Sequence, residues 1–328
     1  MKHLFIINPI SFSKQSEMLA VIASIEGYFK TTGDNHYIHI SRFPRDGIRF
    51  VRCFVQDAEG EMVRVYAVGS DGIVFDCLNG LQGLPNAQLA IVPYGMYSDF
   101  LYAFGEIGQV REVFRDIPTM ATSGTIATDI ISLGQRYAIN HCTLGVEALA
   151  FYKHFDVRRK YPDLARRFGK SFYKIGAPLA IMDKRAYNYE YEITVDGKSY
   201  DGKYVGVHIT NTGVYGGGLT PAPMARPDDG YLDIITVQTV SRATLIRMLG
   251  KYTSGKYYVP GGPPKEEYLR KSLRHIRGKE ITVRSNNPMF INADSETHHD
   301  SNINIKILPA HVQIVVPNGL TYVRRDSR

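Results

Sequence analysis

The chain has 328 residues, of which 44% are hydrophobic and 22% charged, and this composition excludes a disordered chain, a collagen-like chain and a disulfide scaffold. The 39 Lys and Arg against 32 Asp and Glu give a formal net charge of +7. This excess favours an anionic partner, which could be a nucleotide, a phospholipid surface or a nucleic acid. The length predicts about two domains.

The cysteines and the apolar runs indicate the compartment. Cys53, Cys77 and Cys142 form no CxxC pair, which argues against a zinc site and favours reduced thiols in a cytoplasm. The first apolar run, Leu4–Ile7, is too short for a signal peptide. No run approaches the ~20 apolar residues that span a bilayer. We therefore expect a soluble, cytoplasmic protein that can associate peripherally with a membrane.

Strand and helix patterns alternate over the first third of the chain. Strands are predicted at His3–Ile7, Tyr37–Ile40, Val63–Val68 and Gln88–Val92. Helices are predicted at 14–30, 45–57, 73–82 and 97–104. Alternation with short connections predicts a parallel sheet covered by helices on both faces.

The pattern changes after about residue 125. Tyrosines and aliphatic residues alternate with polar residues from Tyr187 to Val195, and the turn Asp196-Gly197 follows. Further strands are predicted at Tyr204–Thr210, Leu232–Val237, Glu280–Val283, Ile303–Ile307 and Val312–Val316. Helices are predicted near 155–180 and 241–256. The second half is therefore expected to be mostly antiparallel β.

Polar turns follow three of the predicted parallel strands, at Asn8–Ser11, Gly69–Gly72 and Pro93–Phe100. Glycines let backbone N–H groups approach an anion, and a helix N-terminus adds its positive dipole end. Ligands bind beyond the carboxyl ends of parallel strands, so the three turns are expected to converge on one crevice. Each turn alone is equally well interpreted as a tight structural turn. No Walker A loop occurs, and no Gly-x-Gly-x-x-Gly in the first half, which disfavours P-loop NTPases and dinucleotide dehydrogenases.

These motifs resemble the diacylglycerol kinase catalytic family, which comprises soluble bacterial lipid kinases and their sphingosine and ceramide kinase relatives. In the first half the resemblance is carried by Asn8-Pro9 with Ser11, Gly69-Ser70-Asp71-Gly72 with Asn79-Gly80-Leu81, and Pro93-x-Gly95 with Ser98-Asp99-Phe100. In the second half it is carried by Asn140, Gly145, Ala148, Asn211, Gly216-Gly217-Gly218, Pro221, Ala225, Pro227, Asp229-Gly230-Tyr231-Leu232-Asp233 and Asp294-Ser295-Glu296.

The resemblance implies an α/β plus mostly β fold with two domains. Residues 1–125 would form a Rossmann-like parallel-sheet nucleotide domain, and residues 126–316 an antiparallel β-sandwich domain that binds the lipid. The active site would lie in the cleft between them. The C-terminal segment 317–328 is expected to pack back on the first domain.

The resemblance also implies the activity, an ATP-dependent transfer of phosphate to the hydroxyl of diacylglycerol or a similar lipid alcohol. The residues expected to bind the nucleotide are Asn8, Pro9, Ser11, Ser41, Gly69, Ser70, Asp71, Gly72, Asp76, Gly95 and Ser98. Mg²⁺ is expected to bridge the nucleotide phosphates. A second, structural Mg²⁺ is implied at Asp228, Asp229 and the carbonyl of Tyr231.

Asp294 and Glu296 are implied as the catalytic carboxylates. Residues two apart on a strand share a face, so both groups are expected to point toward the acceptor hydroxyl. A polar loop beside His298 and His299 is the alternative interpretation of the same spacing.

The chain departs from the family pattern inside the phosphate-binding motifs. Substitutions stand at Phe12, Ser70, Ile73, Asp76, Met96, Ser98 and Ser295. The threonine hydroxyls missing at Ile73 and Met96 predict weaker nucleotide binding. A catalytically weak homologue that binds a lipid or nucleotide is therefore an alternative, and an NAD kinase, which shares a similar loop, is a more distant one.

Basic residues interleaved with aromatic ones suit an anionic lipid surface, although a solvated face is an equal interpretation. The first cluster is Lys153, Arg158, Arg159, Lys160, Arg166, Arg167, Lys170 and Lys174, and the second is Arg270, Lys271, Arg274, Arg277 and Lys279. Nucleic acid is not expected as a partner, because no binding motif accompanies the charge. The expected partners are a lipid substrate and an anionic membrane surface, and a homodimer stays open.

Overall fold

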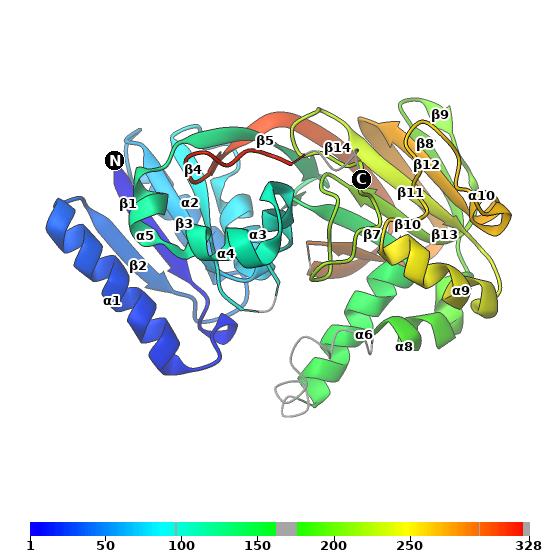
Figure 1. The fold of residues 1–328 in the computed structure, drawn as a ribbon, viewed down its shortest axis with the longest axis horizontal. Coiled ribbons are helices and arrows are strands. Elements are labelled where there is room, and N and C mark those ends of the chain that lie inside the picture. The colour runs from blue at the N-terminus through cyan, green and yellow to red at the C-terminus, as the bar shows by residue number, and fades with distance from the viewer. Residues whose placement is uncertain (96, 162–175, 295, 324–328) are drawn as a thin grey trace. The chain divides into compact units, whose positions relative to one another are not determined.

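The computed structural model describes the chain apart from residues 96, 162–175, 295 and 324–328. It contains two compact units, whose elements are labelled in Figure 1. The first unit comprises Met1–Asp129 and Ala310–Val323, and the second comprises Ile130–Pro309.

The first unit is built on a parallel sheet of short apolar strands. These are β1 (Lys2–Ile7), β2 (His36–Ile40), β3 (Val63–Gly69) and β4 (Ala87–Pro93), with the end of β14 (Glu296–Val315) beside β4. Their order is β2-β1-β3-β4-β14, and each of these pairings is parallel. Every residue of β3 is buried, as expected for a strand with helices on both faces.

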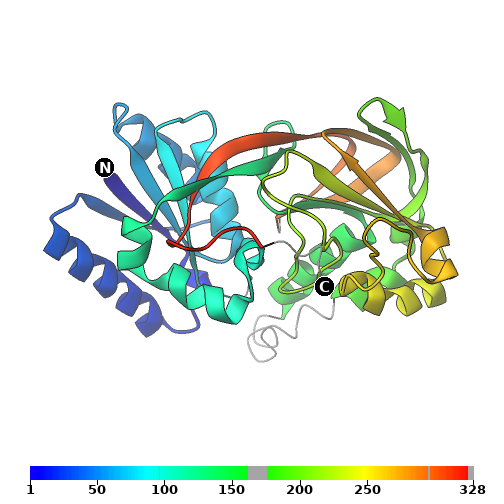
Figure 2. The ribbon, with the colours of Figure 1, turned by 45° about the horizontal axis from the view of Figure 1, so that its top comes forward.

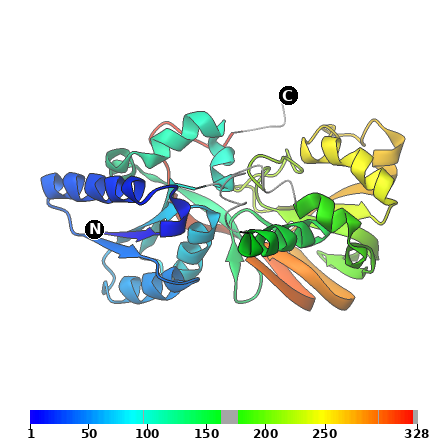
Figure 3. The same ribbon diagram turned by 90° about the horizontal axis from the view of Figure 1, so that it is seen from below.

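Helices cover both faces of this sheet. They are α1 (Gln15–Thr32), α2 (Asp46–Gln56), α3 (Asp71–Leu81), α4 (Ile107–Arg115) and α5 (Ile117–Thr122), with the 3₁₀ helices η1 (Pro9–Ser11) and η2 (Asp99–Phe104). Figure 3 shows α1 and α5 on one side of the strands, and α2 and α3 on the other. The last two helices pack closely at Gly80, where a Cβ atom would lie 2.8 Å from Cβ of Val51. Glycine is therefore required at this crossing.

The second unit is mainly antiparallel. Its strands are β5 (Thr125–Ser132), which begins in the first unit, β6 (Tyr137–Ala138), β7 (His141–Gly145), β8 (Glu190–Val195), β9 (Lys198–Ser199), β10 (Gly202–Thr210), β11 (Leu232–Gln238), β12 (Leu273–Gly278), β13 (Glu280–Ala293) and most of β14. Its helices are α6 (Val146–Lys160), α8 (Gly176–Met182), η4 (Lys184–Tyr187), α9 (Arg242–Thr253) and α10 (Glu267–Ser272). Strand β10 pairs antiparallel with β7, β8 and β11. Figure 2 shows α6, α8 and α9 along one side of these strands.

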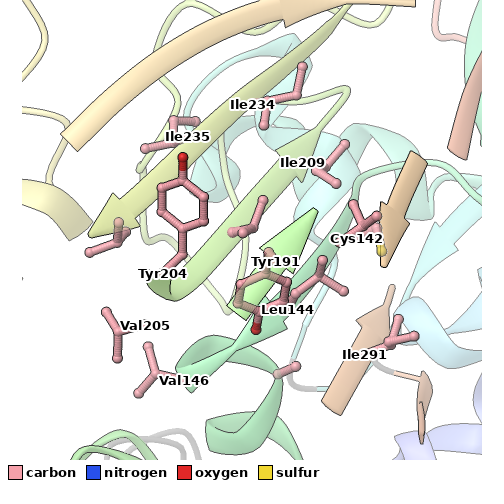
Figure 4. Packing of buried hydrophobic residues seen from close by; sticks show 14 of the residues in the cluster. Cys142, Leu144, Val146, Tyr191, Tyr204, Val205, Ile209, Ile234, Ile235 and Ile291 are labelled. Atoms are coloured by element: carbon pink, nitrogen blue, oxygen red, sulfur yellow. The ribbon is translucent and has the colours of Figure 1, made fainter. Parts of the chain in front are cut away.

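The core of the second unit follows from strand alternation. Buried and exposed residues alternate strictly along β8, which matches the predicted tyrosine pattern. Figure 4 shows Tyr191 of β8 packed near Leu144, and Ile209 and Ile234 on the neighbouring strands. All four side chains are at most 1% exposed. The core is therefore formed by the inward face of several strands together.

Two of the predicted strands, Ile303–Ile307 and Val312–Val316, belong to the single strand β14. The apolar pattern is interrupted at Pro309 and Ala310, where the chain leaves the second unit and enters the first. At this point the Ala310 N–H donates to a carboxylate oxygen of Asp129 at 2.7 Å. The prediction of two separate strands was wrong. The interruption of the apolar pattern looks like a turn in the sequence, but it marks the point where one strand passes from the second unit to the first.

The boundaries of the units also differ from the predicted ones. The first unit extends to Asp129 rather than residue 125, and the chain returns to it at Ala310 rather than residue 317. Both crossings lie inside strands, β5 and β14, so no loop marks them in the sequence. The predicted helix 97–104 corresponds to the 3₁₀ helix η2. The predicted helix 155–180 overlaps two helices, α6, which begins before residue 155, and α8. Among the described residues, no helix is long and apolar enough to cross a membrane.

The conformation of Gly145 predicts that a side chain at this position destabilises the protein. Its φ is +73°, and a Cβ atom would lie 2.4 Å from the carbonyl oxygen of Val205. We expect Gly145→Ala to lower the free energy of unfolding by about 3 kcal/mol, from backbone strain and a steric clash together. Gly197 is the comparison, since its φ is also positive at +79° but no atom lies within 4 Å of its Cβ position, whereas Gly145 in addition has a ψ of −131°, outside the left-handed region.

Gly197→Ala is therefore expected to cost only about 1 kcal/mol, the cost of the left-handed conformation. Urea unfolding followed by circular dichroism measures both variants. Equal losses would show that the contact with Val205 has no effect on stability.

Candidate functional site

The three polar turns of the first unit meet at Ser11. Ser70 donates its backbone N–H to Oγ of Ser11 at 3.2 Å. A Cβ atom on Gly69 would lie 2.8 Å from the same Oγ, and one on Gly95 would lie 3.2 Å from Cβ of Ser11. The structure therefore brings the ends of β1, β3 and β4 to one point, where two glycines leave room that a side chain would fill.

The backbone at this point explains which substitutions the chain tolerates. Gly69 has a φ of +157°, at the limit of the region that favours glycine, whereas Ser70 is extended with a φ of −94°. A side chain at position 70 is therefore accommodated without strain. Asn8 accepts a hydrogen bond from the N–H of Ile10 at 3.2 Å and so caps η1, which begins at Pro9.

The carboxylate of Asp71 connects the second turn to the third. Asp71 lies in the first turn of α3, followed by Gly72, and is 5% exposed. Its two oxygens accept the backbone N–H of Asp99 at 3.1 and 3.2 Å. A buried carboxylate at a helix N-terminus is stabilised there by the helix dipole. Asp71 therefore stabilises the arrangement of the two turns.

Some of the residues predicted to bind the nucleotide have side chains that are buried or already hydrogen-bonded within the protein. Ser98 is 6% exposed, and its hydroxyl donates to the adjacent carbonyl of Tyr97 at 2.9 Å. Ser41 lies beside the end of β1, and its Oγ is buried without a hydrogen bond. Asp76 is buried against Gly47 in the packing of α2 on α3. Met96 lies outside the described residues.

Two arginines on α4, which the sequence analysis missed, lie beside the third turn. Arg111 donates to the carbonyl of Gly95 at 2.5 Å, and its Nε is buried without a hydrogen bond. Arg115 donates to the carbonyl of Pro93 at 2.7 Å. Burial, and then the charge of Arg115, lowers the pKa of Arg111. Their spacing of four residues on a helix was the signal that could have identified them.

Aromatic stacking accommodates Phe12, which replaces a glycine of the family pattern. The rings of Phe12 and Tyr94 stack with centroids 4.8 Å apart. The guanidinium of Arg115 lies 4.5 Å from the centre of the Tyr94 ring. The first turn, the third turn and α4 are therefore joined by one stack.

In the second unit, the carboxylate of Asp294 is enclosed by backbone. It accepts N–H hydrogen bonds from Ile139 at 2.5 Å, from Asn140 at 3.0 Å and from His141 at 3.0 Å. Asp294 is 2% exposed. Burial raises its pKa to about 6, and the hydrogen bonds from the three amides oppose that rise. The three amides therefore favour the ionised form of the group.

Asp294 and Glu296 do not lie on one strand, and this expectation was wrong. Strand β13 ends at Ala293, strand β14 begins at Glu296, and these two residues face each other across the hairpin. Asp294 lies in the turn with a left-handed φ of 43°, which Asp tolerates better than most residues. Ser295 lies outside the described residues. The two-residue spacing thus corresponds to a hairpin tip, where the rule for strand faces does not apply.

The asparagines of the resemblance are gathered around this hairpin. Asn211 donates from its side chain to the carbonyl of Ile139 at 2.9 Å, and its N–H donates to the carbonyl of Asn140 at 2.8 Å. The side-chain oxygen of Asn140 accepts from the hydroxyl of Thr212 at 3.2 Å. These bonds hold the 139–141 backbone in the position that binds Asp294.

The two carboxylates implied for the structural magnesium site are paired with arginines. Asp228 accepts two hydrogen bonds from Arg226, at 2.9 and 3.0 Å. Asp229 accepts from Arg277 at 2.6 Å and from the N–H of Tyr231 at 3.1 Å. Each carboxylate is thus neutralised by a guanidinium group. Among the described residues, no group of three or more His, Cys, Asp or Glu side chains could hold a metal ion.

Acidic neighbours neutralise part of the first basic cluster. Lys153 pairs with Asp183 at 3.0 Å, and Asp156 pairs with both Arg159 and Lys160. These pairs favour a solvated face for this part of α6. The remaining members Arg166, Arg167, Lys170 and Lys174 lie outside the described residues.

An apolar cavity of about 260 Å³ lies among α6, α8, α9 and β11. Glu147 and Tyr252 lie in its wall, and the hydroxyl of Tyr252 donates to the carboxylate of Glu147 at 2.5 Å. The other oxygen of Glu147 contacts Nδ1 of His208 at 2.8 Å. The wall is otherwise mostly apolar, which suits a hydrocarbon chain.

Two sequence families match the chain. Residues 2–133 match the diacylglycerol kinase catalytic domain, and residues 152–316 match the YegS C-terminal NAD kinase beta sandwich-like domain. Curated relatives include proteins named "Putative lipid kinase" in Staphylococcus aureus strain Newman and "Putative lipid kinase SaurJH9_0749" in strain JH9. Each is 24% identical over 257 residues, which are 78% of this chain and 78% of the relative.

Solved structures have a similar fold. A putative diacylglycerol kinase from Bacillus anthracis str. Sterne gives a TM-score of 0.70 at 21% identity, over 97% of both chains. A second diacylglycerol kinase structure from the same organism gives 0.66 at 19% identity, over 98% of both. The fold is thus diacylglycerol kinase-like, with a C-terminal β-sandwich-like domain. Because the two family matches account for both halves, the chain belongs to the family that combines a diacylglycerol kinase catalytic domain with a YegS C-terminal beta sandwich-like domain.

Proposed function

We propose that the chain transfers the γ-phosphoryl group of ATP to the hydroxyl of a lipid such as diacylglycerol. The observation that carries this proposal is the junction of the three turns at Ser11, Gly69 and Gly95. Glycines at the ends of β3 and β4 leave the backbone N–H groups accessible, which suits the close approach of phosphate groups. Membership of the family supports phosphotransfer, and the names of the relatives support a lipid acceptor.

The arginines of α4 would supply charge that the altered turns lack. The Nε–H of Arg111, which is buried without a partner, would donate to a phosphate oxygen. This donor would offset the hydroxyl missing at Ile73, whose side chain is 1% exposed. A divalent cation that enters with the nucleotide would neutralise the β- and γ-phosphates.

The hairpin carboxylates would divide their roles. Glu296 would accept the proton of the lipid hydroxyl as the new P–O bond forms and the bond to the β-phosphate oxygen breaks, releasing ADP. Asp294, whose oxygens bind three backbone amides, would hold the hairpin that carries Glu296. An acyl chain of the acceptor would occupy the apolar cavity of the second unit.

A second candidate is a protein that binds nucleotide or lipid without turnover. The inward hydroxyl of Ser98 and the buried Ile73 favour it, because both remove phosphate donors from the site. Labelled ATP with a panel of lipid alcohols and NAD in mixed micelles distinguishes the candidates. Transfer to a lipid supports the kinase, transfer to NAD the more distant NAD kinase, and binding without transfer the second candidate.

The first site prediction concerns Asp71. We expect Asp71→Asn to lower lipid phosphorylation at least tenfold, because a neutral amide holds the third turn less firmly and removes a charge near the phosphates. The rate is measured in the micelle assay, and circular dichroism checks that the variant is folded. Unchanged turnover in a folded variant would remove these turns from the active site.

The second prediction separates the hairpin carboxylates. Glu296→Gln should lower kcat by about 10²–10⁴, the range for loss of a general base, and leave the thermal midpoint unchanged. Asp294→Asn should lower the free energy of unfolding by about 3 kcal/mol, because at least one buried amide N–H loses its acceptor. Steady-state kinetics and thermal unfolding of both variants measure the difference. An Asp294→Asn variant of normal stability and low kcat would return Asp294 to the catalytic step.

The third prediction concerns the phosphate-binding turn. Ile73→Thr restores a hydroxyl at the start of α3 and should tighten binding of a non-hydrolysable ATP analogue by roughly tenfold, the value of about one hydrogen bond to a charged group. Ser70→Gly is the control and should have little effect, because Ser70 is already extended. Calorimetric titration measures both. If Ile73→Thr binds no better than Ser70→Gly, this turn does not bind ATP phosphates through position 73.

A further inference from the structure

The helices that line the apolar cavity also carry exposed apolar side chains. On α8, Leu179 is 42% exposed and Met182 is 64% exposed, and on α9, Ile246 is 58% exposed. On each helix other residues line the cavity, among them Ile181 on α8 and Met248 on α9. Both helices are therefore apolar on two sides, toward the cavity and toward solvent. A helix that only covers a core needs an apolar side toward that core alone.

Hydrogen bonds from one arginine hold the two helices side by side. Arg242, in the first turn of α9, donates to the carbonyl of Ile181 at 3.1 Å and to that of Met182 at 3.4 Å. Its guanidinium also lies 5.2 Å from the centre of the Tyr187 ring. These bonds help to satisfy the carbonyls at the C-terminal end of α8, where the carbonyl of Ile181 also accepts from the hydroxyl of Tyr187 at 3.0 Å. Figure 1 shows the two helices next to each other. The exposed apolar residues of α8 and α9 thus belong to one face.

The charge of this face has one sign. The sequences of α8 and α9 contain no Asp or Glu, whereas α9 carries Arg242 and Arg247, together with Lys251, which is paired with Glu266. Lys184, two residues after the end of α8, is exposed. Asp183, the acidic residue between them, already pairs with Lys153 and Arg185. An apolar face with basic residues and few free carboxylates complements a surface of anionic lipids.

We propose that the α8–α9 face, defined by Leu179, Met182, Lys184, Ile246 and Arg247, docks on the surface of an anionic lipid bilayer. Docking would bring the hydrocarbon layer to the helices that line the cavity, so that one acyl chain passes from the bilayer into it. The delivery of an acyl chain rests on the proposed function, in which the acceptor is a lipid. The docking of the face on a bilayer is independent of catalysis. It places membrane contact on α8 and α9, away from the paired residues of α6.

Vesicle sedimentation tests the docking. The double variant Met182→Ser with Ile246→Ser is compared with Leu19→Ser with Met62→Ser, which removes one methionine and one aliphatic residue exposed in the first unit. A second test uses the double variant Lys184→Glu/Arg247→Glu. Its control is the double variant Lys30→Glu/Arg49→Glu, which reverses one lysine and one arginine charge on α1 and α2. The vesicles contain phosphatidylglycerol and phosphatidylcholine in equal parts.

We expect each α8–α9 variant to lower the partition coefficient at least tenfold, and the controls to bind like the wild type. Equal binding of variants, controls and wild type would overturn the proposal. So would a wild-type dimer in size-exclusion chromatography that the Ser variant dissociates, because the face would then bind a second copy of the chain.

A kinase assay separates this inference from the proposed function. The α8–α9 variants should lose activity on a long-chain acceptor in vesicles but keep it on a short-chain acceptor dissolved as monomers. If the wild type phosphorylates neither acceptor, the proposed function fails while sedimentation still decides the docking. If the variants lose both activities equally, the face acts on the site itself and the docking proposal fails.

Discussion

The hydrogen bonds from three consecutive backbone amides to the carboxylate of Asp294 determine the geometry of the second unit near its candidate site. A buried ionised carboxylate is costly unless its oxygens are satisfied, so the hairpin tip and the 139–141 backbone must stay together. The side chain of Asn211 and the hydroxyl of Thr212 bind the same segment from the other side. Three separate segments of the sequence, 139–141, 211–212 and the turn at Asp294, thus depend on one charge. This constraint explains why Glu296, two residues further on, begins a strand at a fixed position.

The first unit combines the buried carboxylate of Asp71, which joins two of its turns, with a close approach of backbone. Here the constraint is the space around Ser11, where Gly69 and Gly95 allow backbone from three strands to approach. A Cβ atom at either glycine would push the turns apart. The same close approach explains why Ser70 is tolerated and why the stack of Phe12 on Tyr94 can lie at the edge of the site. In this unit shape determines what can bind, and the arginines of α4 add the charge.

Positive charge is distributed differently from what the linear sequence suggests. The runs of basic residues on α6 and in β12 are partly neutralised by Asp156, Asp183 and Asp229. The cations with functional potential are more isolated in the sequence, Arg111 beside Gly95 and Arg247 beside Ile246. A charge contributes to ligand or membrane binding only if no carboxylate of the protein already neutralises it. Density in the sequence is therefore a poor guide to which cations remain available.

The sequence by itself determined the parallel strands of the first unit, the alternation in β8 and the three polar turns at strand ends, because each depends on local periodicity or on residue type at a turn. The motifs also indicated the family before any geometry was known. Only the tertiary structure decided that β14 is one strand, that Asp294 lies in a hairpin turn and that Arg111 reaches Gly95. It also decided that Asp228 and Asp229 pair with arginines. These features depend on residues far apart in the chain, and spacing along the sequence carries no information about which partner a buried or charged group meets in space.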